Sequence, residues 1–119
     1  MDLVVKGRRH RVTDRERDVC AKKLARLERT NPRAVRCEIE IVAPEHGSRT
    51  RTMRVDAALD IPRRTFRASG EGRDVDSGID QVVDRLDRQL RDHAGRRRRK
   101  AARSDRLHSA GIRDDTHPD

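Results

Sequence analysis

DVDSGIDQVVDRLDRQL, residues 74–90, decides the fold because its apolar side chains recur at helical spacing. At about 3.6 residues per turn these side chains form a single stripe, which comprises Ile79, Val82, Val83, Leu86 and Leu90. Asp74 is a good N-cap, Asp76 adds a negative charge to the first turn, and Gly95 marks the expected end of the helix. A helix with one apolar stripe has to bury it, so the rest of the chain must supply a surface that covers the stripe.

The face opposite the stripe is polar and carries Arg85, Arg88 and Arg91. Asp84 and Asp87 precede two of these arginines by four residues, and each such pair stabilises a helix by about 0.2–0.5 kcal/mol. One interpretation of this face is a solvated surface held by the pairs. The other is that the arginines bind phosphate, and the helix pattern alone is compatible with both.

The composition of the chain favours a partner rich in phosphate. The chain has 119 residues, enough for one domain with a small core, and 32% of them are hydrophobic. Its 30 Lys+Arg against 21 Asp+Glu give a net charge of +9. Phe66 is its only Phe, Tyr or Trp, so the chain lacks the aromatic platforms on which single-strand binders stack bases. A bound nucleic acid would therefore be held by its backbone and shape.

A helix over residues 13–29 is predicted to follow a short strand at residues 2–7. Thr13 and Glu16 form a capping box at its start, and Asn31–Pro32 ends it. Its apolar stripe contains Cys20, Leu24 and Leu27. The basic residues that point away from this stripe are Arg15, Lys22, Arg26 and Arg29, with Lys23 at its flank.

Three further strands are predicted between the two helices. Apolar and polar side chains alternate in residues 35–41, 53–59 and 65–68, a period of two that buries one face of a sheet. The positions expected to face the core are Val35, Cys37, Ile39, Ile41, Met53, Val55, Ala57, Leu59, Phe66 and Ala68. The predicted order is thus β-α-β-β-β-α. Because each helix has one stripe and the sheet has one apolar side, we expect an α+β fold with both helices on one face of a four-stranded sheet.

The composition changes after Gly95, where the predicted domain of residues 1–95 ends. Residues 96–100 are five consecutive basic residues, and the segment 96–119 has only Leu107 and Ile112 as sizeable apolar side chains. We expect this segment to be a disordered basic tail. It holds 8 Lys+Arg and 4 Asp+Glu, so part of the net positive charge belongs to the domain itself.

The sequence contains no motif that indicates an enzyme, a cofactor or a small-molecule substrate. Residues 70–72, GEG, lack the spacing of a phosphate-binding loop, and no serine lies in a nucleophile motif. The five histidines have no metal-ligand spacing, and Cys20 and Cys37 form no CxxC pair, so we expect two buried thiols and no metal site. Because no apolar run is long enough to span a bilayer, we expect a soluble cytoplasmic protein without a membrane partner.

Five short segments together resemble one known family. They are VVKGR near the start, VTD at the first helix cap, KKLARLER in the first helix, ASG before the second helix, and D-x-x-x-x-ID-x-VVDRLDRQLR within it. In order and spacing over residues 2 to about 92, they are similar to the ribosome hibernation-promoting factors. This family is also known as ribosome-associated translation inhibitors and as sigma-54 modulation proteins.

The resemblance implies a non-enzymatic protein of the same fold that binds the small ribosomal subunit and its 16S-type rRNA. It would lie in the channel between head and body, overlap the mRNA and tRNA positions, and inhibit translation during ribosome hibernation, a stress response. We expect it to be a monomer when free. The RNA-binding residues carried over by position are Lys22, Lys23, Arg26, Arg85, Arg88 and Arg91, and the outward position of Arg29 adds it to this set.

The chain departs from the family pattern at three positions. Glu16 stands where the family has an apolar residue, and Asp76 and Gly78 replace an aromatic residue and an alanine, which favours a looser start of the second helix. Long family members also carry a second domain that pairs two ribosomes, and residues 96–119 do not resemble that domain.

Two other functions are compatible with these residues. Sheets covered by two helices also occur in free-standing binders of double-stranded RNA, which recognise shape and phosphate. The historical family name suggests instead a protein-binding modulator of a transcription factor. Sedimentation with ribosomal subunits, combined with competition by duplex RNA, would separate the three hypotheses.

Overall fold

The structure, a computed structural model, describes residues 1–109, with side chains described through residue 103. Its six elements are β1 (Asp2–Arg8), α1 (Asp14–Thr30), β2 (Arg36–Val42), β3 (Met53–Ile61), β4 (Arg64–Gly72) and α2 (Val75–Ser109). The predicted order β-α-β-β-β-α and the α+β class are confirmed. The end of the predicted tail, residues 110–119, lies outside the described residues.

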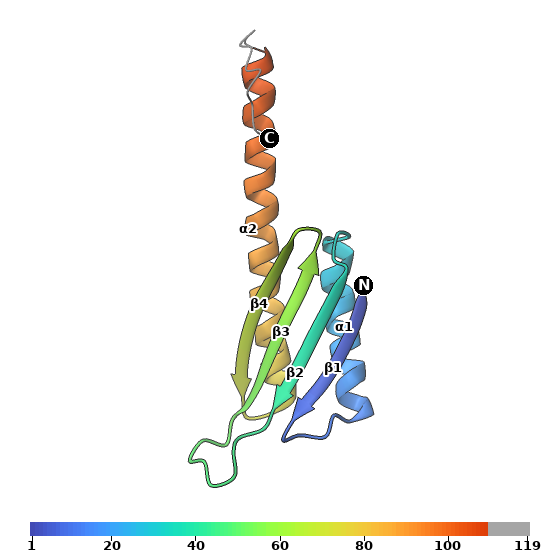
Figure 1. Cartoon of the computed structure of the whole chain (residues 1–119), viewed down its shortest axis with the longest axis vertical. Coiled ribbons are helices and arrows are strands. Elements are labelled where there is room, and N and C mark those ends of the chain that lie inside the picture. Colours follow the sequence, from blue (N-terminus) through green and yellow to red (C-terminus); the bar gives the residue numbers. More distant parts are fainter. Residues whose placement is uncertain (110–119) are drawn as a thin grey trace.

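The four strands form one sheet in the order β1-β2-β3-β4. β1 and β2 pair in parallel, so the chain crosses over through α1 between them, whereas β2 with β3 and β3 with β4 pair antiparallel. Figure 1 shows both helices on the same face of the sheet, α1 along the β1 side and α2 along the β4 side. The predicted arrangement of two helices on one face is therefore confirmed, and the described residues leave the opposite face of the sheet uncovered.

The apolar stripe of α2 is buried as predicted. Four of its five residues are at most 3% exposed, namely Ile79, Val82, Leu86 and Leu90. Val83 is half-buried and packs against the same core. The α1 stripe and the inward-facing strand residues complete that single core, which includes Cys20, Leu24, Leu27, Cys37, Ile39, Ile41, Val55, Ala57, Leu59 and Phe66.

The prediction that Val35 faces the core is wrong, because its side chain is 54% exposed. β2 begins at Arg36, so the alternation of the strand does not extend to the residue before it. Met53 and Ala68, also predicted to face the core, are partly buried against it.

Both predicted helix starts are confirmed. The Thr13 hydroxyl accepts the backbone N–H of Glu16 at 3.1 Å, and the Glu16 carboxylate accepts the backbone N–H of Thr13 at 2.9 Å. Asp74 accepts the backbone N–H of Ser77 at 2.8 Å, and this hydrogen bond holds the pKa of Asp74 below its ordinary value. The two N-caps fix where the helices begin.

Glu16 is buried although it is charged, with 7% of the residue exposed. Both of its carboxylate oxygens lie near Nε2 of His10, at 2.9 and 3.0 Å. Burial disfavours the charged carboxylate, but the hydrogen bonds from Thr13 and His10 outweigh it, so the pKa of Glu16 lies below its ordinary value. Its hydrogen-bond partners thus stabilise a charged carboxylate at this buried position.

The start of α2 packs tightly, and the expectation of a looser start is wrong. A Cβ at Gly78 would lie 2.7 Å from Cγ2 of Val55, and a Cβ at Gly70 would lie 2.6 Å from the carbonyl oxygen of Gly78. The helix and the sheet therefore approach each other closely at this point, which glycine allows because it has no side chain. Asp76, the other departure in this turn, pairs with Arg15 of α1 at 2.7 Å.

The prediction that the second helix ends at Gly95 is wrong, because α2 continues to Ser109. Glycine inside a helix costs about 1 kcal/mol relative to alanine, and the arginine, lysine and alanine residues that follow are good helix formers. No proline follows until Pro118. Residues 96–109 are thus helical rather than disordered, and Figure 1 shows this part of α2 extending beyond the sheet. The division of the chain at residue 95 into a domain and a separate tail stays a prediction.

Cys20 and Cys37 are fully buried free thiols, as the sequence predicted. Burial raises the pKa of Cys20 to about 11 and that of Cys37 to about 12. Both residues therefore act as small apolar core residues with protonated thiols.

Candidate nucleic-acid interface

The residues predicted to bind RNA all lie on the two helices, but their surroundings differ. Lys22, Arg26 and Arg29 lie on the exposed side of α1. None of these three forms an ion pair with another described residue. We call them the α1 row, and their charges are available to an external partner.

Lys23 faces α2 rather than solvent. Its Nζ forms an ion pair with Asp80 of α2, and its side chain is 28% exposed. Arg15 forms a second pair between the helices, with Asp76, and this hydrogen bond raises the pKa of Arg15. Lys23 therefore helps to fix α1 against α2, and Asp80 offsets its charge.

A groove of about 230 Å³ lies between the two helices. Its α1 wall includes Arg26 and Thr30, and its α2 wall carries three aspartates, Asp80, Asp84 and Asp87. Lys23, Arg26 and Arg91 also line this groove, so its three aspartates are balanced by three cations. Asp80 pairs with Lys23, and Asp87 pairs with Arg91. The groove between the two helices therefore adds no net positive charge to their exposed sides.

Arg88 and Arg91 form the α2 row, on the exposed side of that helix. Of the two predicted i,i+4 pairs, Asp87 with Arg91 is formed at 2.9 Å, whereas no ion pair within residues 1–103 joins Asp84 to Arg88. The Arg91 side chain is 77% exposed despite its pair. An exposed pair of this kind contributes about 0–1 kcal/mol, so it leaves Arg91 able to exchange Asp87 for a phosphate.

Arg85 lies over the edge of the sheet instead of facing solvent alone. Its guanidinium donates to the backbone carbonyl of Ser69 in β4. Gln81 and Gln89, one turn before and after it, form hydrogen bonds of 3.1 and 2.8 Å with other backbone groups of β4. β4 is an edge strand, and these three side chains bond to backbone groups that an edge leaves unpaired. The i,i+4,i+8 spacing of Gln, Arg and Gln was visible in the sequence, but nothing local identified the strand that they bond to.

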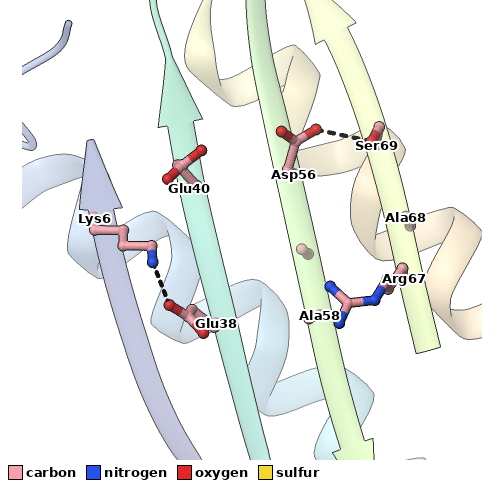
Figure 2. Close-up of a pocket in the computed structure, with 9 residues that line it drawn as sticks. Lys6, Glu38, Glu40, Asp56, Ala58, Arg67, Ala68 and Ser69 are labelled. Atoms are coloured by element: carbon pink, nitrogen blue, oxygen red, sulfur yellow. Dashed lines mark hydrogen bonds and ion pairs between the residues drawn. The ribbon is translucent and has the colours of Figure 1, made fainter. Parts of the chain in front are cut away.

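The uncovered face of the sheet has a different electrostatic character. A hollow of about 390 Å³ lies on this face. Its charged lining residues are the carboxylates Glu38, Glu40 and Asp56 and the cations Lys6 and Arg67 (Figure 2). Lys6 pairs with Glu38 at 2.5 Å, and Ser69 donates to Asp56 at 2.8 Å. The carboxylates of this hollow pair with Lys6, Arg8 and Arg54, so the basic residues of this face are largely offset, whereas the α1 row has no such partners among the described residues. The helix side is therefore the better candidate for a nucleic-acid interface.

The described part of the chain contains neither a metal site nor a membrane-spanning helix. No group of three or more His, Cys, Asp or Glu side chains there could hold a metal ion. No helix within residues 1–109 is long and apolar enough to cross a membrane.

Two solved structures share this architecture. The crystal structure of the Protein Y N-terminal domain from Thermus thermophilus is 29% identical, with a TM-score of 0.65, over 76% of this chain and 96% of that chain. A ribosomal subunit interface protein from Coxiella burnetii is 21% identical, with a TM-score of 0.71, over 80% of this chain and 99% of that chain. At that lower identity the second comparison shows the shared fold alone. Among curated protein sequences, none matches the chain significantly.

A family model gives the more specific result. The model described as Sigma 54 modulation protein / S30EA ribosomal protein matches residues 3–98. This match includes most of the chain, both helix starts and all of the predicted RNA-binding residues, and it confirms the resemblance inferred from the short sequence motifs. The chain belongs to the Sigma 54 modulation protein / S30EA ribosomal protein family.

Proposed function

We propose that this protein binds the small ribosomal subunit through its 16S-type rRNA, occupies the mRNA and tRNA channel, and inhibits translation without catalysing a reaction. The observation that carries the proposal is the pair of exposed cation rows on the helix side of a chain from a ribosomal protein family. On this proposal the protein acts in the cytoplasm, under stress, and is a monomer when free.

The geometry of the two rows suits an RNA backbone. Packed helices lie about 8–10 Å apart, so the α1 row and the α2 row can contact two neighbouring stretches of phosphate. The aspartates of the groove are balanced by its three cations, so the groove adds no net attraction for phosphate, which favours RNA on the exposed sides of the two helices. Since Phe66 is the only large aromatic residue and is buried, recognition rests on the backbone and shape of the RNA instead of base stacking.

The residues make unequal contributions on this proposal. Lys22, Arg26, Arg29, Arg88 and Arg91 would contact phosphate directly. Lys23 would act mainly through its pair with Asp80, by holding α1 in place, and Arg85 would divide its hydrogen bonds between β4 and the RNA.

Sedimentation through a sucrose gradient tests the proposal. We expect the protein to migrate with small subunits and monosomes, to stay at the top with large subunits alone, and to resist competition by an excess of plain duplex RNA. With six to eight phosphate contacts, the affinity should fall by roughly two to four orders of magnitude between about 50 and 200 mM salt. Failure to migrate with small subunits would overturn the proposal, and release by duplex RNA would favour a general binder of double-stranded RNA.

A further inference from the structure

The part of α2 just beyond Gly95 has the highest density of positive charge in the described structure. The side chains of residues 96–103 are exposed, and α2 contributes its last fully buried core residue at Leu90. Six of the eight residues are cationic and none is acidic, the cations being Arg96, Arg97, Arg98, Arg99, Lys100 and Arg103. We call residues 96–103 the basic arm.

The charge density of the basic arm is close to that of a nucleic-acid duplex. Eight helical residues rise about 12 Å, so six cations give about one positive charge per 2 Å of helix axis. A DNA duplex carries one negative charge per about 1.7 Å of its axis. The fold does not depend on these exposed positive charges, so their high density favours a polyanion as the partner.

The arm also continues the basic side of α2 in the same helical phase. Arg91 and Arg98 are seven residues apart, which is almost two full turns, and Arg88 and Arg99 are eleven apart, which is almost three. Since α2 is one continuous helix, Arg91 and Arg98 form one line and Arg88 and Arg99 a second, about 80° further round the axis, and together the four arginines extend about 17 Å along one side of α2, from the domain onto the arm. We call them the outer arginine line.

The intrinsic stability of the arm helix favours a bound partner as well. Arg96 and Lys100, and likewise Arg99 and Arg103, are like-charged pairs at i,i+4, which destabilise a helix. The arm has no apolar stripe, so burial offers no compensation. Phosphates along one side would relieve this repulsion and stabilise the helix that the structure describes.

We propose that the basic arm binds the phosphate backbone of duplex RNA as a second contact, in line with the α2 row and outside the domain. This inference rests on the proposed function, because the RNA duplex in question is that of the ribosome. It adds a prediction that the domain surface alone does not make. The affinity for RNA should depend on which side of the arm carries the charge and on the helical form of the arm.

Two matched double substitutions in the full chain test the proposal. Arg98→Gln with Arg99→Gln removes two charges from the outer arginine line, and Arg97→Gln with Lys100→Gln removes two charges from the opposite side of the same helix. Glutamine has nearly the helix propensity of arginine, so the helix is retained. For binding to purified small subunits, the first pair should lower the salt slope by about 1.4–1.8 and weaken binding by on the order of 10- to 60-fold near 0.1 M salt. The second pair should have less than half that effect on the slope.

A third variant tests the helical form of the arm independently of its charge. Gly95→Pro retains every cation of the arm but interrupts α2 where it leaves the domain. We expect it to bind as weakly as the Arg98/Arg99 variant while the domain still unfolds in a single cooperative transition, so that the loss of binding is not a loss of the fold. Equal effects of the two double substitutions, or wild-type binding by Gly95→Pro, would overturn the proposal of a helical contact.

The failure of the proposed function can be distinguished from the failure of this inference. If the wild-type chain does not bind small subunits, the proposed function fails, and the same variants measured on a short RNA duplex still decide the role of the arm. If the outer-line variant binds both RNAs as the wild type does but no longer binds vesicles of phosphatidylserine and phosphatidylcholine, the partner is a lipid surface and the proposal is overturned.

Discussion

Replacing Gly78 by alanine tests how α2 is seated on the sheet, and the same change at Gly95 is a matched control in the same helix. Glycine to alanine inside a helix normally stabilises by about 1 kcal/mol. At Gly78 the new Cβ would lie 2.7 Å from Cγ2 of Val55, which has no exposed surface and a stiff β-branched side chain. Overpacking of this kind costs about 1–3 kcal/mol, so the net effect should be a loss of about 0–2 kcal/mol.

At Gly95 the nearest atoms to the new Cβ are guanidinium nitrogens, of Arg99 at 3.3 Å and Arg98 at 4.0 Å. These are the flexible ends of exposed side chains, so they can move and the gain of up to about 1 kcal/mol should be retained. Thermal unfolding monitored by circular dichroism should place the Tm of Gly78→Ala at least about 4 °C below that of Gly95→Ala, since 1 kcal/mol shifts the Tm of a small domain by roughly 4–8 °C. Equal increases in Tm would refute the close approach of α2 to β3. A decrease for Gly95→Ala would mean that the helix ends at this glycine after all.

Three further predictions concern the core and its ionisable groups. Leu86→Ala should lower the free energy of unfolding in urea by about 2–5 kcal/mol because Leu86 is fully buried. Val35→Ala, at an exposed position, should change it by no more than about 0.5 kcal/mol, and similar losses at both positions would contradict the described packing. The folded-state pKa of Glu16 is below its ordinary value of 4.5, so Glu16 stabilises the fold above that pH, and this contribution is lost as the pH falls through the folded-state pKa. Glu16→Gln should therefore reduce the fall in the free energy of unfolding at acid pH. An unchanged dependence of stability on pH would argue against the pair with His10. The thiols of Cys20 and Cys37 should react with a disulfide reagent at pH 8 only after unfolding, because burial raises their pKa values to about 11 and 12, and rapid labelling of the native protein would count against their burial.

The fold could be predicted from the sequence because its determinants are local. Each helix or strand is indicated by residues close together in sequence: the α2 stripe, the Thr13 capping box and the alternation of the strands. Because every element must bury one side, few arrangements of these elements are possible. The prediction failed where a residue's role depends on a partner distant in sequence. Gly78 suggested a loose helix start, yet Val55 and Gly70 make it a point of close packing.

The residue types and helix faces of the candidate site could be predicted from the sequence. Which of its basic residues are paired within the protein could not. Helical periodicity placed Lys22 and Arg26 on an outer surface, and the structure places them there. It could not show that Lys23 pairs with Asp80 of the other helix, or that Arg85 bonds to the edge strand β4, because both depend on how the helices are placed. The end of α2 was missed for another reason: a single glycine is a weak stop signal when good helix formers follow it.

Charge reversal on the two helices provides the most direct test of the proposed function. Lys22→Glu with Arg26→Glu reverses two charges of the α1 row, and Arg88→Glu with Arg91→Glu reverses the α2 row. Arg85 is left unchanged because its bond to Ser69 would confound stability with binding. Exposed charges contribute little to folding, so the Tm of each variant should stay within a few degrees of the wild type.

The control is an equal change in net charge on the uncovered face of the sheet, Arg36→Glu with Arg54→Glu. The measurement is inhibition of translation in a cell-free system as a function of protein concentration, with small-subunit binding measured in parallel. The account predicts that both helix variants lose inhibition and binding together, while the sheet variant retains most of each. Equal losses from helix and sheet variants would leave only a general attraction between a basic protein and RNA, and full inhibition by the helix variants would contradict the assignment of the helix side as the binding surface.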